Sequence, residues 1–323
     1  MDDVRIKNNS LDLFKLFCCI LTISAHVFFP TSSNAGEYFY CQWFVRFIVP
    51  FFFISTGFFF AQMKQEKVIS YLKRIFILYM ISAIAYIPIM IYVVPGGHSI
   101  LYYMTFGYSH LWYLVALFEG LILVWLTQKI PSNIKYIPAL ILFLVGIFFG
   151  SYYKIFNTPF LIKCDEFFES IGKVRSAPFL AYPVLMVGVY VYENKFLYEI
   201  GTRVLFLLLI LSFAAGFFEA DFLFNHTDFT TLSNDITIFG GTPALFMVML
   251  CLKIKNNFEF KTLRKIRKIA DWVYIVQYFS IYPLIIFAGY LDYPGRLFLI
   301  SAAASLILSL LIEAFLSFLG SKK

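Results

Sequence analysis

Apolar runs of about 20 residues, separated by short polar segments, follow one another along the whole chain. Runs of this length cross the hydrocarbon core of a bilayer as helices, because a helix satisfies its backbone hydrogen bonds internally. The fold class is therefore predicted to be all-α, a polytopic bundle of ten transmembrane helices. The predicted spans cover residues 11–30, 43–62, 72–94, 110–128, 136–153, 176–192, 203–219, 236–252, 269–290 and 296–318.

The composition agrees with this pattern. Of the 323 residues, 61% are hydrophobic and only 14% are charged, which lies outside the range of a soluble domain. No stretch is long and polar enough for a soluble domain, and no internal repeat is visible, so we predict one transmembrane domain over residues 1–323. The first span carries Asp12 and Lys15 without a small-residue cleavage site, which predicts a retained helix rather than a signal peptide.

The distribution of charge predicts the orientation. With a cytoplasmic N-terminus, most of the 26 lysines and arginines fall in inner segments, as cytoplasmic loops require. Both termini are therefore predicted to be cytoplasmic, and the net charge of +7 needs no nucleic-acid partner. The dense basic run 261–268 contacts anionic lipid head groups or attracts a polyanionic cytosolic ligand.

The longest outer connections are predicted near 154–175 and 219–235, where Glu219 and Asp221 stand among other charges. They form either a solvated surface or the first contact for an external substrate. Of the five cysteines, Cys41 and Cys164 fall near the outer side, where they can pair or stay free. No metal-ligand spacing, G-x-S-x-G elbow, H-E-x-x-H motif or Walker loop occurs, so zinc, hydrolase and NTPase chemistry have no support.

Two ionisable side chains stand in the first apolar span. Lys15 precedes His26 by eleven residues, so on an α-helix their side chains share a face to within ~20° and lie ~16 Å apart along the axis. Ionisable groups in lipid cost several kcal/mol unless they face a partner or a polar cavity. Lys15 can instead extend to the cytoplasmic interface or pair with Asp12, and His26 can simply bond to a neighbouring helix.

Further polar groups are predicted at the same depth in the membrane as His26, toward the outer side. Arg46 opens the second span, His110 begins the fourth, and Arg175 precedes the sixth. Together with Trp112 and Tyr113 these groups suit a polar reaction centre or an anionic ligand, although an interfacial belt also explains the aromatic residues. Gly57 and Gly188 permit close helix approach, as ordinary helix packing also requires.

Several motifs, taken in their order along the chain, resemble those of the membrane-bound acyltransferase 3 family. This family includes O-acetyltransferases of envelope glycans. Lys15 and His26 match its basic residue and histidine, with lysine in place of the usual arginine. Pro50, Phe52, Phe53, Thr56 and Gly57 match its second-helix motif, with threonine for serine; 110–114 (HLWYL) resembles its HLWFL segment; and Arg175 with Gly188 matches a further motif. Gln277 stands where the family often has a histidine, which limits it to hydrogen bonding.

The resemblance implies transfer of an acyl group, commonly acetyl, from cytoplasmic acyl-CoA to a hydroxyl of an envelope glycan or lipid-linked sugar, in a bacterial cell membrane. Together with the polar groups expected at the level of His26, it predicts catalysis by His26, Arg46, His110 and Arg175, and no metal. The acyl-CoA phosphates are assigned to Lys15, Lys73 and Arg74. Trp112, Tyr113, Thr56 and Gln277 are assigned to substrate binding. His26 acts as a general base or itself carries the acyl group.

Two other functions stay open. The chain also resembles the membrane domain of serine and alanine racemases linked to vancomycin resistance, which implies amino-acid uptake, although no racemase domain follows Lys323. The remaining hypothesis is a structural or regulatory membrane subunit without catalysis.

Overall fold

The computed structural model describes residues 9–28, 35–93, 99–131, 134–156, 158–170, 175–227, 236–254, 260–288 and 293–320. The described residues form helices, turns and short connections, without strands. Among these residues, eight helical runs are long and apolar enough to cross a membrane, and two shorter apolar helices, Ala177–Glu193 and Thr242–Lys253, stand between them. These runs correspond one to one to the predicted spans, so the protein is an all-α integral membrane protein.

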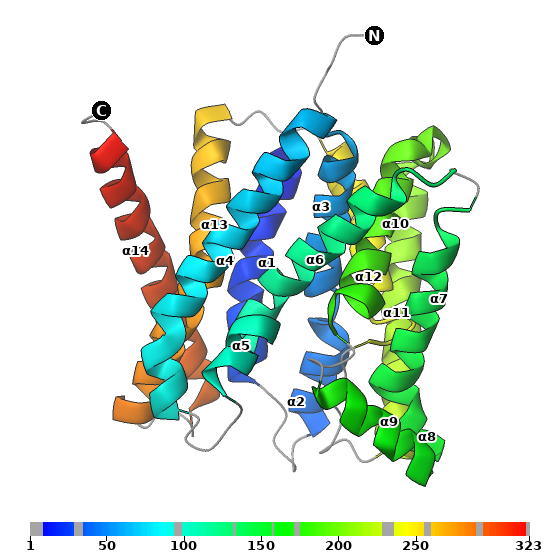
Figure 1. Ribbon diagram of the computed structural model, residues 1–323, viewed down its shortest axis with the longest axis horizontal. Helices are drawn as coiled ribbons and strands as arrows, with labels where there is room; N and C mark the ends of the chain where they lie inside the picture. The colour runs from blue at the N-terminus through cyan, green and yellow to red at the C-terminus, as the bar shows by residue number, and fades with distance from the viewer. Residues whose placement is uncertain are drawn as a thin grey trace.

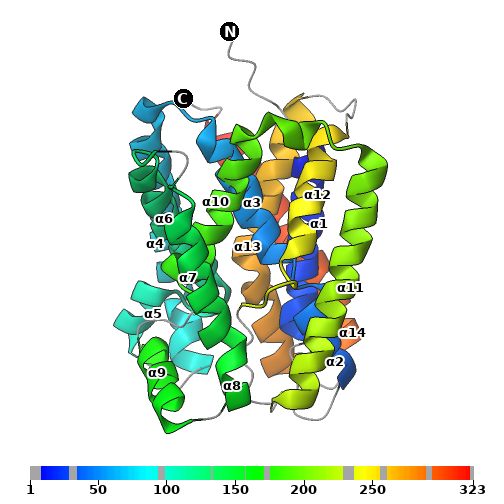
Figure 2. The ribbon, with the colours of Figure 1, turned by 90° about the vertical axis from the view of Figure 1, so that its right-hand side faces the viewer.

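The long elements are α1 (Asn9–Val27), α3 (Ile48–Ala61), α4 (Gln65–Val93), α6 (Trp112–Thr127), α7 (Ile137–Ile147), α10 (Tyr182–Glu193), α11 (Thr202–His226), α12 (Thr242–Lys253), α13 (Phe260–Ala288) and α14 (Pro294–Gly320). The start of α1 and the end of α14 lie at the same end of the bundle (Figure 1). The short helices α2 (Ala35–Phe39), α5 (Ile100–Phe106), α8 (Tyr153–Phe156) and α9 (Pro159–Ser170) lie at the opposite end (Figures 1 and 2).

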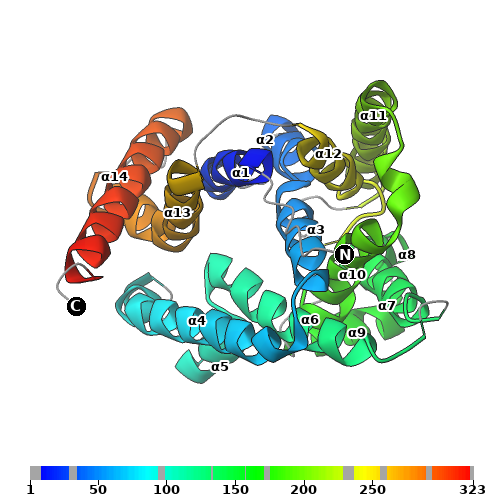
Figure 3. The same ribbon diagram turned by 90° about the horizontal axis from the view of Figure 1, so that it is seen from above.

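Helix α3 lies in the middle of the bundle, between α1 and α10 (Figure 3). Its sequence is apolar around its whole circumference, as expected of a helix that is buried on every side. Helix α12 packs against both α1 and α3, and α13 packs against α1 and α14. Helix α1 is therefore held between α13 on one side and α3 with α12 on the other.

Two glycines set the distance between α3 and α10. A Cβ atom added at Gly57 would lie 2.1 Å from the carbonyl oxygen of Leu185, and one at Gly188 would lie 2.1 Å from that of Ile54. The two backbones therefore touch, because only hydrogen fits between them. The predicted role of Gly57 and Gly188 in close helix approach is confirmed.

Polar contacts fix the start of α13. This helix begins with the basic run 261–268, and we call the end of the bundle where this run lies the basic end. Arg267 donates to both carboxylate oxygens of Asp12 on α1, at 2.9 and 2.6 Å, and Lys268 pairs with Glu313 on α14 at 2.5 Å. The hydrogen-bonded partner of Asp12 is therefore Arg267, whose forked guanidinium contacts both oxygens, and the charge of Lys15 interacts with Asp12 as well. The basic run 261–268 lies on this helix rather than in a loop.

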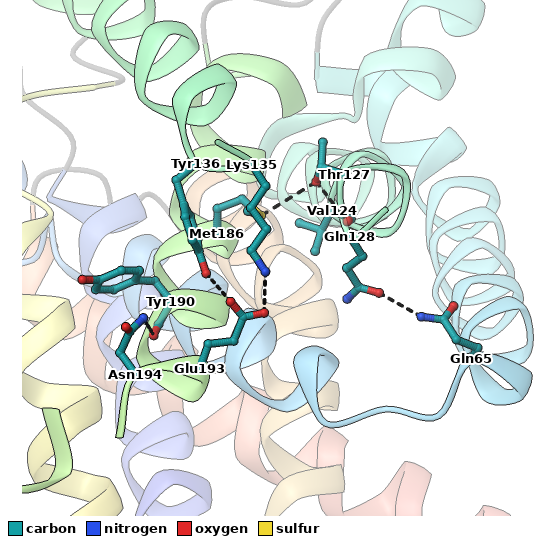
Figure 4. Close-up of polar contacts among 10 residues, drawn as sticks. All are labelled: Gln65, Val124, Thr127, Gln128, Lys135, Tyr136, Met186, Tyr190, Glu193 and Asn194. Carbon is teal, nitrogen blue, oxygen red and sulfur yellow. Dashed lines mark hydrogen bonds and ion pairs between the residues drawn. The ribbon is translucent and has the colours of Figure 1, made fainter. Parts of the chain in front are cut away.

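A second polar group joins α7 to α10 (Figure 4). Lys135, just before α7, pairs with Glu193 at the end of α10 at 2.5 Å, and the Tyr136 hydroxyl donates to the other oxygen of Glu193 at 2.6 Å. Burial and the hydrogen bond to Glu193 raise the pKa of Tyr136. Both side chains anchor the start of α7 at one end of the bundle.

The second membrane span begins earlier than the predicted 43–62. It runs over 35–61 as α2, a π-helical turn (Tyr40–Phe44) and α3. A π-helical turn carries an extra residue and shifts the side chains that follow it. As a result Arg46 lies in the turn between the π-helical segment and α3 rather than within a regular helix.

The described parts of the two predicted outer loops are mostly helical. Segment 154–175 contains α9, and α11 continues to His226, so Glu219 and Asp221 are helical. The apolar run Phe222–Phe224 extends the helix beyond the predicted end. Asp228 and Asp235 lie outside the described residues. Cys41 and Cys164 are both free, and Sγ of Cys41 lies 2.8 Å from the carbonyl oxygen of Phe28.

Candidate functional site

A cavity of about 390 Å³ lies inside the bundle, between α1, the π-helical turn, α3, α10 and α12. Its wall combines a few polar side chains with many apolar ones, as ligand sites commonly do. Among the polar residues are six that the sequence singled out: His26, Arg46, His110, Trp112, Tyr113 and Arg175. Four separate stretches of the chain contribute them, so only the tertiary fold brings them together.

His26 occupies the end of α1 beside α13. Its Nδ1 shares a 2.9 Å hydrogen bond with the hydroxyl of Tyr278, and its ring lies 6.3 Å from that of His110, centroid to centroid. The ring of Tyr278 stacks on His110 at 4.8 Å. The bond through Nδ1 leaves Nε2 of His26 as the ring nitrogen for a substrate.

His110 is almost fully buried, at 2% exposure. Its Nε2 lies 3.3 Å from the carbonyl oxygen of Ile275, and a carbonyl can only accept, so Nε2 carries the hydrogen and Nδ1 is an acceptor. Nδ1 has no hydrogen-bond partner among the described residues. The hydroxyl of Tyr274 donates to the backbone carbonyl of His110. His110 is thus fixed to α13 at two points.

The two arginines lie on different parts of the cavity wall. The guanidinium of Arg175 stands 5.1 Å above the ring of Trp112, a cation–π contact that orients both side chains. Arg46 lies against the segment before α12: a Cβ atom added at Gly240 would be 3.0 Å from its Cγ and 2.4 Å from Oγ1 of Thr237. Gly240 therefore leaves room for Arg46 beside the wall residue Thr237.

The segment 236–241 forms part of the wall and is held by a buried carboxylate. Glu219 on α11 accepts hydrogen bonds from the backbone N–H groups of Ile238 and Phe239, both at 2.6 Å, and from the hydroxyl of Tyr152 at 2.5 Å. Ser151 donates to the carbonyl of Ile236 at 2.6 Å. This irregular backbone is satisfied by protein groups, as a membrane interior demands.

Lys15 lies nearer the start of α1 than His26 does, on the same face of this helix. Its Nζ stands 5.6 Å from the ring centroid of Phe59, and its charge interacts with Asp12 and Asp271. Asp271 and Tyr278 are seven residues apart, which places them on one face of α13. The face of α1 that carries Lys15 and His26 thus lies along the face of α13 that carries Asp271 and Tyr278.

Four other predicted site residues lie away from the cavity wall. Lys73 and Arg74 are exposed on α4, near the basic end, and the charge of Arg74 interacts with Asp271. Gln277 is fully buried and donates to the carbonyl of Tyr274 at 3.0 Å. The structure brings neither Gln277 nor Thr56 to the cavity.

Four residues of the site were not assigned a role from the sequence: Tyr278, Asp271, Glu219 and Gln42. Asp271 and Glu219 carry a detectable signal, a carboxylate inside an apolar helix. Gln42 lines the cavity, and its Oε1 has no hydrogen-bond partner among the described residues. Neither Gln42 nor Tyr278 stands out among so many polar and aromatic positions.

Within the described part of the chain, no group of three or more His, Cys, Asp or Glu can hold a metal ion.

A family model described as an acyltransferase domain, acyltransferase 3, matches residues 8–317. Two Enterococcus faecalis proteins, each named amino-acid racemase, are similar to the chain. One is 27% identical over 305 residues, 88% of this chain and 42% of that protein. The other is 24% identical over 345 residues, 98% of this chain and 47% of that protein.

The chain thus spans less than half the length of these two relatives. No solved structure matches it significantly. The family match covers nearly all of the helical bundle, including α1 with His26 and the whole cavity wall. The chain therefore belongs to the membrane-bound acyltransferase 3 family and is an integral membrane protein with an acyltransferase domain.

Proposed function

We propose that this protein transfers an acyl group from cytoplasmic acyl-CoA to a hydroxyl of a cell-envelope glycan or lipid-linked sugar, in a bacterial cell membrane. The observation that carries the proposal is the position of His26. Its imidazole lines the cavity together with Arg46 and Arg175, and Tyr278 fixes its Nδ1. A fixed imidazole beside cations suits general-base catalysis of acyl transfer.

The proposed reaction uses His26 as follows. When Nδ1–H of His26 donates to the Tyr278 oxygen, Nε2 carries the lone pair that accepts the proton of the substrate hydroxyl. The oxygen then bonds to the thioester carbon, the carbon–sulfur bond breaks, and the CoA thiolate takes the proton from His26. Arg46 and Arg175, which line the same cavity, are proposed to stabilise the oxyanion of the tetrahedral intermediate.

The donor is proposed to enter from the basic end. Lys15 and Arg74 interact with the same carboxylate, Asp271, which brings these cations into one neighbourhood for the phosphates of CoA. Asp271 is exposed at the surface of the bundle. The ~16 Å between Lys15 and His26 along α1 then separates the phosphate contacts from the reacting carbonyl.

The direct test supplies labelled acetyl-CoA to membranes that contain the full chain, and follows the label into envelope glycans and lipid-linked sugars. Wild-type membranes should transfer label, and His26→Ala should lose transfer by at least about a hundredfold. His226→Ala is the matched control, because this histidine is exposed at the end of α11 and away from the cavity. Equal transfer by His26→Ala and wild type, at equal amounts of folded protein, contradicts the proposal.

A second function is favoured by one finding, the similarity to two proteins named amino-acid racemase. It would make the bundle a carrier of amino acids. The cavity wall argues against it, because its described residues include Arg46 and Arg175 but no carboxylate for an ammonium group. Uptake of labelled serine or alanine into vesicles without acyl-CoA would favour the carrier.

A further inference from the structure

The cavity has two unlike parts. The polar residues His26, Gln42, Arg46, His110, Arg175 and Thr237 line one part, and Thr22, Tyr113, Thr242 and Tyr274 add further hydroxyl groups to the wall. Apolar residues extend the cavity along the middle of the bundle. We call this part the apolar lobe and define it by Val49, Ile54, Phe143, Val184, Val187 and Leu245. Ile54 lies on α3, six residues after the start of this helix at Ile48, which corresponds to ~9 Å along its axis.

The chemistry of the apolar lobe selects one kind of occupant. Its defining side chains offer no hydrogen-bonding group, so a sugar hydroxyl placed there would lose its water without replacement, which is costly. A hydrocarbon chain gains on entering, by about fourfold in affinity for each methylene that leaves water. The lobe and His26 line the same cavity, and the proposed reaction places the thioester carbonyl at His26.

On the side of α7 and α10, the wall of the apolar lobe is shared with a second cavity. A second apolar cavity, also of about 390 Å³, lies between α7 and α10. Phe143, Val184 and Val187 line both cavities. Side chains therefore separate the two spaces, and the phenyl ring of Phe143 is the largest of them.

We infer that the apolar lobe holds the alkyl part of the acyl group, so that the donor carries a chain longer than acetyl, and that Phe143, Val184 and Val187 limit its length. This inference rests on the proposed acyl-CoA function. It assigns the donor chain to the lobe, whereas the polar part of the cavity receives the hydroxyl-bearing acceptor.

The test measures thermal stabilisation of the purified full-length protein by CoA and by acyl-CoAs from acetyl to dodecanoyl. Stabilisation depends on the ratio of ligand concentration to Kd, so it reports binding without the acceptor. For the wild type, Kd should fall about fourfold for each added methylene and then level off at a limiting length. Labelled transfer in membranes should show the same preference.

Three variants locate the limit. Phe143→Ala joins the two cavities and should move the limit to longer chains. Val184→Phe fills the lobe and should lower the ratio of long-chain to acetyl binding by at least about tenfold, the loss expected for two methylenes. Leu245→Phe fills the lobe from α12 and replaces Val184→Phe if that variant fails to fold. Ile141→Ala is the matched control, since Ile141 is on α7 but exposed and outside both cavities.

The outcomes separate the two proposals. A wild-type affinity that does not depend on chain length overturns the inference while leaving acyl transfer intact. A Val184→Phe protein that weakens all donors equally, or that changes only the KM of the acceptor, overturns it too and assigns the lobe to another occupant. No stabilisation by CoA or any acyl-CoA, together with no transfer, counts against the proposed function itself.

Discussion

The hydroxyl of Tyr278 on α13 lies 2.9 Å from Nδ1 of His26 on α1, across a sequence separation of 252 residues. Tyr278 also stacks on His110, so one phenol fixes the orientation of two imidazoles. Because this bond uses Nδ1, Nε2 is the ring nitrogen of His26 that remains for the substrate. Tyr278 is therefore a positioning residue for the proposed base.

Replacing Tyr278 with phenylalanine should lower kcat by about tenfold, the value of one hydrogen bond. The phenyl ring preserves the stacking on His110, so the protein should fold and KM for acyl-CoA should stay near the wild-type value. Steady-state kinetics on membranes of both proteins checks this. A change confined to KM, or a loss as complete as that of His26→Ala, would contradict a positioning role.

Lys15→Ala should weaken the binding of CoA by about tenfold or more, because it removes a cation that can make charge-assisted hydrogen bonds to phosphate. Arg74→Ala should act in the same direction. Titration of purified protein with CoA measures the effect. Lys67→Ala, an exposed lysine on α4, is the control, and an equal loss in this variant would show that only overall charge matters.

Gly188→Ala and Gly57→Ala should each destabilise the protein by about 3 kcal/mol or more, the upper range for overpacking. Each added methyl would meet backbone of the facing helix at 2.1 Å, and backbone cannot rotate away. Gly201→Ala should be neutral, because nothing lies within 4 Å of its Cβ position. Melting temperatures in detergent compare the three variants, and a wild-type melting temperature for Gly188→Ala would exclude the close contact of α3 and α10.

Glu219→Gln should destabilise the protein by about 3 kcal/mol, because an amide cannot accept all the bonds that the carboxylate accepts from Ile238, Phe239 and Tyr152. The cavity wall at 236–241 should loosen, so the rate of acyl transfer should fall as well. Thermal unfolding and transfer assays measure both effects. Asp221→Asn, two residues further along α11, is the matched control and should change neither quantity.

Arg267→Ala should destabilise the protein by about 2 kcal/mol, because it leaves the buried carboxylate of Asp12 without its forked partner. A double-mutant cycle with Asp12→Asn isolates the pair: the double variant should lose less than the sum of the single variants. Lys265→Ala, on the same helix and exposed, should have little effect. Strict additivity in the cycle would mean that the two side chains do not interact.

The sequence by itself determined the all-α membrane fold, the approximate position of every apolar helix and the family. Each of these properties depends on local composition: a run of apolar residues must form a helix in lipid, wherever its neighbours lie. The shared face of Lys15 and His26 was predictable for the same reason, because it depends only on the period of one helix. Gly57 and Gly188 were likewise detectable as places for close approach.

Tertiary structure alone decided which partners these residues have. Asp12 bonds to Arg267 rather than Lys15, Tyr278 bonds to His26, and Glu219 holds backbone of the cavity wall instead of lying in a loop. Such pairings join helices far apart in the chain, and they depend on how the helices rotate and pack against one another. Apolar periodicity hardly constrains that rotation where a helix such as α3 is apolar on all sides, so the cavity and its two unlike parts emerge only from the assembled bundle.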